Sequence, residues 1–224
     1  MFDFLESGAD RDSCEYALVF LHGFGANARD VCSIASVLNG FGDFSGVRFL
    51  FPEAPVRKFD LYEPVEYCQS WYDYKGWFPT VKIEQSVDEA VDALLQLVRD
   101  AAAAGRLPFD RIFLGGFSQG GAVAVEALCR SQLPFAGAIA LSADYPLSAA
   151  CSRPAARPTP LFLGHGLMDP MVPIQWKEGP VADLKAAGYA VEEGIYEGLA
   201  HGIGRAELAD VARFMAAHMK SAAA

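Results

Sequence analysis

The chain has 224 residues, of which 52% are apolar and 21% charged, a composition typical of a globular protein and not of a disordered one. This length suits one α/β domain with a sizeable core, so we expect a single domain over residues 1–224. The formal net charge is −10. Such an acidic chain argues against nucleic acid or an anionic membrane as partner, because both require clustered Lys and Arg.

Cysteine usage and the N-terminal residues bear on location. The five cysteines are widely spaced and contain no Cys-x-x-Cys pair, which favours reduced thiols in a cytoplasmic protein. Residues 1–6 carry neither a basic region nor a long apolar run, so no signal peptide is expected. No segment reaches the roughly 18 apolar residues of a membrane span. We expect a monomer or weak homodimer with at most peripheral membrane contact.

Apolar runs that suit strands alternate with runs that suit helices. Continuous apolar runs are typical of strands covered on both faces, and their alternation with helices predicts an α/β fold. The sheet should be mostly parallel and doubly wound, with helices on both faces. The predicted strands are 17–21, 47–51, 111–115, 136–141, 159–164 and 190–196, and the predicted helices are 28–38, 83–104, 120–129, about 179–187 and 206–219.

The segment from Gly115 to Gly121 is the most informative of the chain. It reads Gly-Gly-Phe-Ser-Gln-Gly-Gly and joins a predicted strand to a predicted helix. A Gly-x-Ser-x-Gly at such a turn indicates the nucleophile elbow of an α/β-hydrolase, which lifts Ser118 above the sheet. Side chains two positions either side of the serine would collide, which explains Gly116 and Gly120. The alternative is an ordinary serine in a glycine-rich turn, since so short a motif also occurs by chance.

A serine nucleophile needs a histidine base. The chain has four histidines. His201 lies in a predicted loop between the last strand and the last helix, which favours it as the base. His22 and His165 lie at strand ends, where a structural role is the alternative. His218 falls in the last helix and is expected at the surface or in an interface.

The base needs an acid to orient it, and two aspartates follow predicted strands after the elbow. Asp169 can reach the far nitrogen of a histidine in the neighbouring loop, whereas Asp144 follows the preceding strand. The order Ser118, Asp169, His201 is the order serine, acid, histidine of α/β-hydrolases, which favours Asp169. The alternative for Asp169 is a turn initiator before a proline.

A loop after the first clear strand is a candidate for stabilising the oxyanion. It reads His22-Gly23-Phe24-Gly25, in the place of the His-Gly loop of such hydrolases. Its glycines allow the Phe24 amide to turn towards Ser118, where it would join the Gln119 amide at the helix start. The alternative is an ordinary strand–helix loop.

Several blocks together resemble the acyl-protein thioesterase/lysophospholipase–carboxylesterase family of α/β-hydrolases. They occur in the family's order and span nearly the whole chain. The blocks are Leu21-His22-Gly23-Phe24-Gly25, Phe51-Pro52-Glu53-Ala54-Pro55, Ser70-Trp71-Tyr72-Asp73, Gly115 to Gly121, Leu141-Ser142, His165 to Pro173, and Gly198-Leu199-Ala200-His201.

The resemblance implies a Ser118 nucleophile, an Asp169 orienting acid and a His201 base. It also implies that the Phe24 and Gln119 amides donate to the oxyanion. No metal or organic cofactor is implied, and no nucleotide-binding or zinc motif is present.

The chain departs from the family pattern in places. Ala26 stands where many relatives have Asp, and Gly202 stands where relatives often have Ser. Neither change removes a catalytic group. The segment 56–79 does not align cleanly, which leaves substrate choice open.

An aromatic-rich flap is expected at about 56–80, beside Ser118. It contains eight aromatic residues, some of which should line an apolar groove for an acyl chain, although a purely structural flap is the alternative. We expect five residues to contact substrate: Phe24, Tyr62, Trp71, Met171 and Leu199.

These observations predict a serine hydrolase of carboxylic esters or acyl thioesters, working through an acyl-enzyme. By resemblance, the substrate is an acylated protein, a lysolipid or a small ester. Two other readings stay open: an acyltransferase, in which an alcohol or amine replaces water, and a catalytically silent binding protein on the same scaffold.

Overall fold

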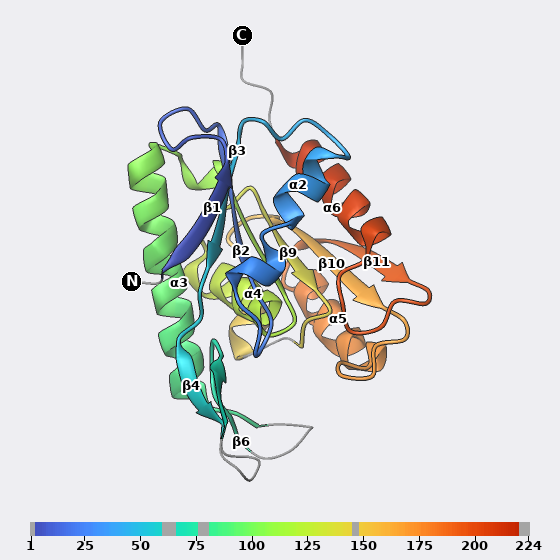
Figure 1. Cartoon of the computed structure of the whole chain (residues 1–224). Helices are drawn as coiled ribbons and strands as arrows, with labels where there is room; N and C mark the ends of the chain where they lie inside the picture. The colour runs from blue at the N-terminus through green and yellow to red at the C-terminus, as the bar shows by residue number, and fades with distance from the viewer. Residues whose placement is uncertain (1–2, 60–65, 76–80, 145–147, 220–224) are drawn as a thin grey trace.

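A computed structural model describes residues 3–59, 66–75, 81–144 and 148–219. Its centre is a seven-stranded sheet in the order β1-β3-β2-β8-β9-β10-β11, which crosses the molecule from β1 to β11 (Figure 1). Every neighbouring pair is parallel except β1 and β3, which are antiparallel. The strands are β1 Phe4–Gly8, β2 Tyr16–Leu21, β3 Val47–Pro52, β8 Ile112–Phe117, β9 Gly137–Leu141, β10 Pro160–Gly166 and β11 Ala190–Tyr196.

Helices cover both faces of this sheet (Figure 1). On one face α3 (Glu84–Gly105), α4 (Gln119–Ser131) and α5 (Glu178–Ala186) enclose one apolar core. On the other face α1 (Ala28–Val31), α2 (Ile34–Asn39) and α6 (Arg205–His218) enclose a second. Three short 3₁₀ turns complete the helical elements: Phe109–Arg111, Ala149–Ser152 and Ile174–Lys177.

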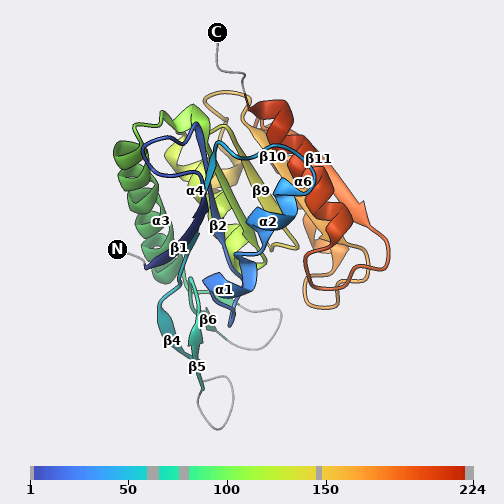
Figure 2. The same cartoon turned by 45° about the horizontal axis from the view of Figure 1, so that its top comes forward.

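Two small antiparallel sheets extend from the end of β3. Strand β4 (Val56–Phe59) pairs with β5 (Glu66–Gln69), and β6 (Tyr74–Lys75) pairs with β7 (Val81–Lys82). Figure 2 shows both projecting beyond the central sheet. The expected aromatic flap falls on this region, and its residues 60–65 and 76–80 lie outside the described ranges.

The expected doubly wound α/β fold is observed, with differences in its elements. The predicted helix over 28–38 is divided into α1 and α2. Cys32 and Ser33 between them have ψ angles of −24° and −17°, closer to a 3₁₀ turn than to an α-helix. Strands β8 and β10 run two residues further than predicted, so Ser118 follows β8 directly.

The direction of the strands positions the site. Because β2, β8, β10 and β11 are parallel, their carboxyl ends meet at one edge of the sheet, where ligands bind in such folds. The segments that follow these four strands hold Phe24, Ser118, Asp169 and His201. None of the helices in the described ranges is long and apolar enough to cross a bilayer.

Candidate active site

Ser118 occupies a strained turn between β8 and α4. Its φ and ψ are 53° and −121°, a conformation that non-glycine residues rarely adopt. A Cβ on Gly116 would lie 2.4 Å from the Gly120 carbonyl carbon, and one on Gly120 would lie 2.5 Å from the His22 carbonyl oxygen. Both contacts are with backbone, which cannot give way. The glycines are therefore required by the close packing of strand, turn and helix.

His201 bridges Ser118 and Asp169. Its Nε2 lies 3.0 Å from the Ser118 Oγ, and its Nδ1 lies 2.8 Å from Asp169 Oδ2. With the carboxylate accepting from Nδ1–H, Nε2 is left free to accept the serine proton. The acid at this position is Asp169 and not Asp144, the other aspartate considered above.

The loops that carry Asp169 and His201 are joined to each other. Met168 N–H donates to the Leu199 carbonyl at 3.0 Å. Asp169 is 6% exposed, and its second oxygen Oδ1 accepts the amides of Met171 at 2.8 Å and Val172 at 2.9 Å. These bonds hold the carboxylate in one orientation, with Oδ2 towards the imidazole.

Two backbone amides are available beside the serine. The Gln119 amide is the first of α4, and the Phe24 amide lies in the loop after β2. Neither donates to a protein acceptor within the described ranges. The neighbouring Gly25 N–H donates to the Gln69 carbonyl at 2.8 Å, which anchors this loop to β5.

The side chain of Gln119 has a role that sequence reasoning missed. It is 2% exposed and holds the segment after β5 against the elbow. Its Oε1 accepts the Trp71 amide at 2.8 Å, and its Nε2 donates to Ser70 Oγ at 3.0 Å and to the Tyr72 carbonyl at 2.9 Å. The one sequence feature that pointed to this role is a long polar side chain in a turn that the fold buries.

His22 and His165 are both buried and have backbone partners. His22 Nδ1 lies 2.7 Å from the Gly23 carbonyl, and its Nε2 accepts the Ala54 amide at 3.1 Å, which fixes a neutral tautomer. His165 Nε2 lies 2.7 Å from the Val172 carbonyl. Burial lowers the pKa of each imidazole, so both favour the neutral form. These contacts are the structural roles considered as alternatives.

The five residues expected to contact substrate differ from one another in exposure. Phe24 is 37% exposed and Met171 51% exposed, while Leu199 is half-buried. Trp71 is fully buried instead, and its indole N–H donates to the His22 carbonyl at 2.8 Å, so its side chain supports the loop after β2. Tyr62 lies outside the described residues.

Comparison with known proteins identifies the family of this chain. The family model of the Phospholipase/Carboxylesterase family matches residues 6–219. The chain belongs to this family. An acyl-protein thioesterase 1 of Yarrowia lipolytica is 30% identical over 214 residues, which cover 91% of this chain and 92% of that protein. A second acyl-protein thioesterase 1, of Mycosarcoma maydis, is 30% identical over 215 residues, covering 88% and 89%.

Solved structures show the same fold. Arabidopsis thaliana SOBER1 has a TM-score of 0.80 and 25% identity, covering 92% of this chain and 99% of that one. Zea mays acyl-protein thioesterase 2 has a TM-score of 0.79 at 22% identity, with 97% and 99% covered, and shares the fold. The family member described here is thus a hydrolase that acts on ester bonds.

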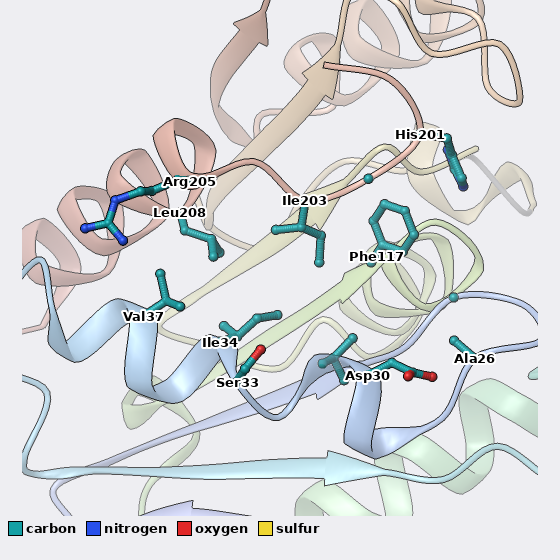
Figure 3. A pocket seen from close by; sticks show the side chains of 13 residues that line it. Ala26, Asp30, Ser33, Ile34, Val37, Phe117, His201, Ile203, Arg205 and Leu208 are labelled. Carbon is teal, nitrogen blue, oxygen red and sulfur yellow. The ribbon is translucent and has the colours of Figure 1, made fainter. Parts of the chain in front are cut away.

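A groove opens beside His201 in this carboxylesterase-family chain (Figure 3). Its volume is about 500 Å³. One wall comes from α1 and α2, and the other from the loop after His201 and the start of α6. In Figure 3, His201 lies at one end and Arg205 at the other, with Phe117 next to His201. This groove was not predictable from the sequence, because its two walls are far apart in the chain.

Glu207 anchors the far end of the His201 loop. It is fully buried on the first turn of α6, where its Oε2 accepts the Gly204 amide at 3.2 Å. Its other oxygen, Oε1, has no hydrogen-bond partner among the residues that the structure describes. Burial raises the pKa of this carboxyl to about 7.

No three His, Cys, Asp or Glu side chains in the described ranges converge as metal ligands would.

Proposed function

We propose that this chain cleaves carboxylic esters or acyl thioesters with Ser118 as nucleophile, His201 as base and Asp169 as the acid that orients it. The observation that carries the proposal is the position of the His201 ring, within 3.0 Å of the hydroxyl and 2.8 Å of the carboxylate. Hydrogen-bond reach between nucleophile, base and orienting acid is the geometric requirement of this chemistry.

Acylation follows from this arrangement. His201 Nε2 takes the Ser118 proton as Oγ attacks the acyl carbonyl carbon. The same proton then passes to the leaving oxygen or sulfur as its bond to that carbon breaks, and the acyl group stays on Oγ. Water, activated by the same imidazole, later adds to the acyl-enzyme and releases the acid.

The charge that develops on the carbonyl oxygen is assigned to the Phe24 and Gln119 amides. Gln119 directly follows Ser118, and Phe24 directly follows Gly23, at which a Cβ would lie 3.4 Å from the Ser118 Cβ. Neither amide has a protein acceptor within the described ranges. The Gln119 amide also lies at the positive end of α4. One such donor is worth about 2.7–4 kcal/mol of transition-state stabilisation.

The substrate class proposed is a fatty-acyl ester or thioester: an S-acylated protein, a lysolipid or a small aliphatic ester. Relatives at 30% identity are acyl-protein thioesterases by name, which supports thioesters. Phe24, which follows Gly23, and Met171, whose amide donates to Asp169, are exposed apolar side chains that suit contact with an acyl chain. We place this activity in the cytoplasm, on a monomer or weak homodimer.

Covalent labelling tests the proposal directly. A fluorophosphonate should label the wild-type protein. Ser118→Ala should not be labelled, and its kcat for ester hydrolysis should fall by about 10⁶-fold. Ser36→Ala, which removes an exposed hydroxyl on α2, is the matched control and should label normally. Labelling that survives Ser118→Ala would contradict the proposed nucleophile.

A substrate comparison then separates the acyl donors. Purified protein is assayed on a palmitoyl-thioester peptide, a lysophospholipid and a short-chain ester. Preference for the thioester peptide would support a protein substrate, and activity confined to the short ester would contradict it.

A further inference from the structure

The groove beside His201 shares a wall with the reacting centre. Gly23, which leads into the loop after β2, lines this groove. A Cβ on Gly23 would lie 3.0 Å from the Phe117 ring and 3.4 Å from the Ser118 Cβ. The Phe117 ring in turn lies 4.8 Å from the His201 ring, centroid to centroid. A group held in the groove therefore reaches both the base and the nucleophile.

The position of His201 decides which part of a substrate the groove receives. Under the proposed function, on which this inference rests, His201 Nε2–H protonates the leaving oxygen or sulfur as its bond to the acyl carbon breaks. The leaving group therefore lies on the His201 side. Phe24, assigned to the acyl chain, does not line this groove, and its ring lies 5.0 Å from the Phe59 ring and 5.7 Å from the Tyr74 ring.

We infer that this groove binds the leaving alcohol or thiol of the substrate and selects one with an apolar body and an anionic far end. The apolar preference follows from the lining, because most of its larger side chains carry no polar group. These side chains come from α1, α2, β8, the His201 loop and α6, and they are Val31, Ile34, Val37, Phe117, Ile203 and Leu208.

The anionic preference follows from Arg205 at the end furthest from His201 (Figure 3). Its guanidinium lies 4.9 Å from the centre of the Phe41 ring and has no carboxylate partner in the described part of the chain. The one acid in the lining, Asp30, lies nearer the other end and already accepts the Asn27 amide at 2.9 Å. In a chain of net charge −10, an unpaired cation here favours an anionic group over a neutral one.

Three butyrate esters test the inference, because they share one acyl group. Their alcohols are methanol, a para-hydroxymethyl-phenylpropanoate, and the matching neutral phenylpropanamide. Val37→Trp narrows the groove far from His201 and should lower the kcat/KM ratio of the amide ester to the methyl ester about tenfold. Arg205→Gln should lower the ratio of the anionic ester to the amide ester about threefold, as expected for an exposed ion pair.

Arg213→Gln is the matched control, since it removes the same charge from the same helix at a side chain outside the groove. It should leave the anionic-to-amide ratio as in wild type. Ratios unchanged in both groove variants would overturn the inference. So would a Val37→Trp effect that appears in a series of methyl esters of longer acids, because the groove would then hold the acyl chain. Wild-type protein that cleaves none of the esters would contradict the proposed function itself.

Discussion

Gln119 and Glu207 are side chains of equal length, each buried on the first turn of a helix, yet the protein satisfies them differently. Gln119 makes three hydrogen bonds of 3.0 Å or less, at both its oxygen and its nitrogen. Glu207 makes one, to the Gly204 amide, and its Oε1 has no partner in the described ranges. Each holds a loop of the site, but only Glu207 can change charge. We expect the stability that Gln119 contributes to be insensitive to pH, and the stability that Glu207 contributes to fall as its buried carboxyl ionises.

The largest effect should come from the hydrogen bond between Asp169 and His201. Asp169→Asn is expected to lower kcat by about 10⁴-fold, because an amide no longer stabilises the imidazole tautomer that accepts the serine proton. Steady-state kinetics on a short-chain ester measures this. Asp144→Asn is the matched control and should retain most of the activity. The reverse outcome would assign the orienting role to Asp144.

Removing the fully paired anchor should be the next largest effect. Gln119→Leu removes the three buried hydrogen bonds that the side chain makes to the Trp71 amide, the Ser70 hydroxyl and the Tyr72 carbonyl, which should lower the free energy of unfolding by about 3 kcal/mol. Urea denaturation followed by fluorescence measures the change at any pH between about 5 and 8. Gln96→Leu, on the exposed face of α3, should change it by less than about 0.5 kcal/mol. Equal effects would mean that the Gln119 network adds no stability.

The effect of Glu207 should appear as a change of folding stability with pH. The pKa of Glu207 is raised from 4.5 in the unfolded chain to about 7 in the folded one. A raised carboxyl pKa means that the folded state binds more protons between these values, so its contribution is complete below pH 4.5 and is lost as pH rises through about 7. Wild type should therefore lose about 2 kcal/mol relative to Glu207→Gln between about pH 5 and 8.

Parallel denaturation curves of the two proteins at both pH values measure this difference. Asp210 favours the protonated form of Glu207 and Lys177 favours the ionised form, but neither is altered in the variant. If the difference in free energy of unfolding between the two proteins stays constant across the pH range, folding does not raise the pKa of Glu207.

The sequence predicted the centre of the molecule better than its periphery. Strands β2 and β9 are buried along their whole length, and their continuous apolar runs made them evident. Strand β1 is exposed at all five positions and depends on antiparallel pairing with β3, a long-range contact with no local signal. The break between α1 and α2 was likewise not evident, because the sequence at this point contains neither Gly nor Pro.

The same division holds for the site. The sequence singled out Ser118, Asp169 and His201, which the structure brings within hydrogen-bond reach, because each follows a strand and parallel strands end at one edge of the sheet. The burial of Trp71 was not predicted, since an aromatic side chain in a connecting segment suits a binding surface as well as a core. The groove depends on how α2 packs near α6, which the chain's local patterns do not specify.

The distance along the polypeptide between Ser118 and His201, 83 residues, has a consequence for biosynthesis. A nascent chain that has completed β8 and α4 already contains Ser118, but the imidazole proposed to activate its hydroxyl belongs to the loop after the last strand of the sheet. Under the proposed function, the chain must therefore be synthesised past His201, and β11 docked on β10, before any ester can be cut. Late assembly of this kind keeps an incomplete product on the ribosome chemically inert.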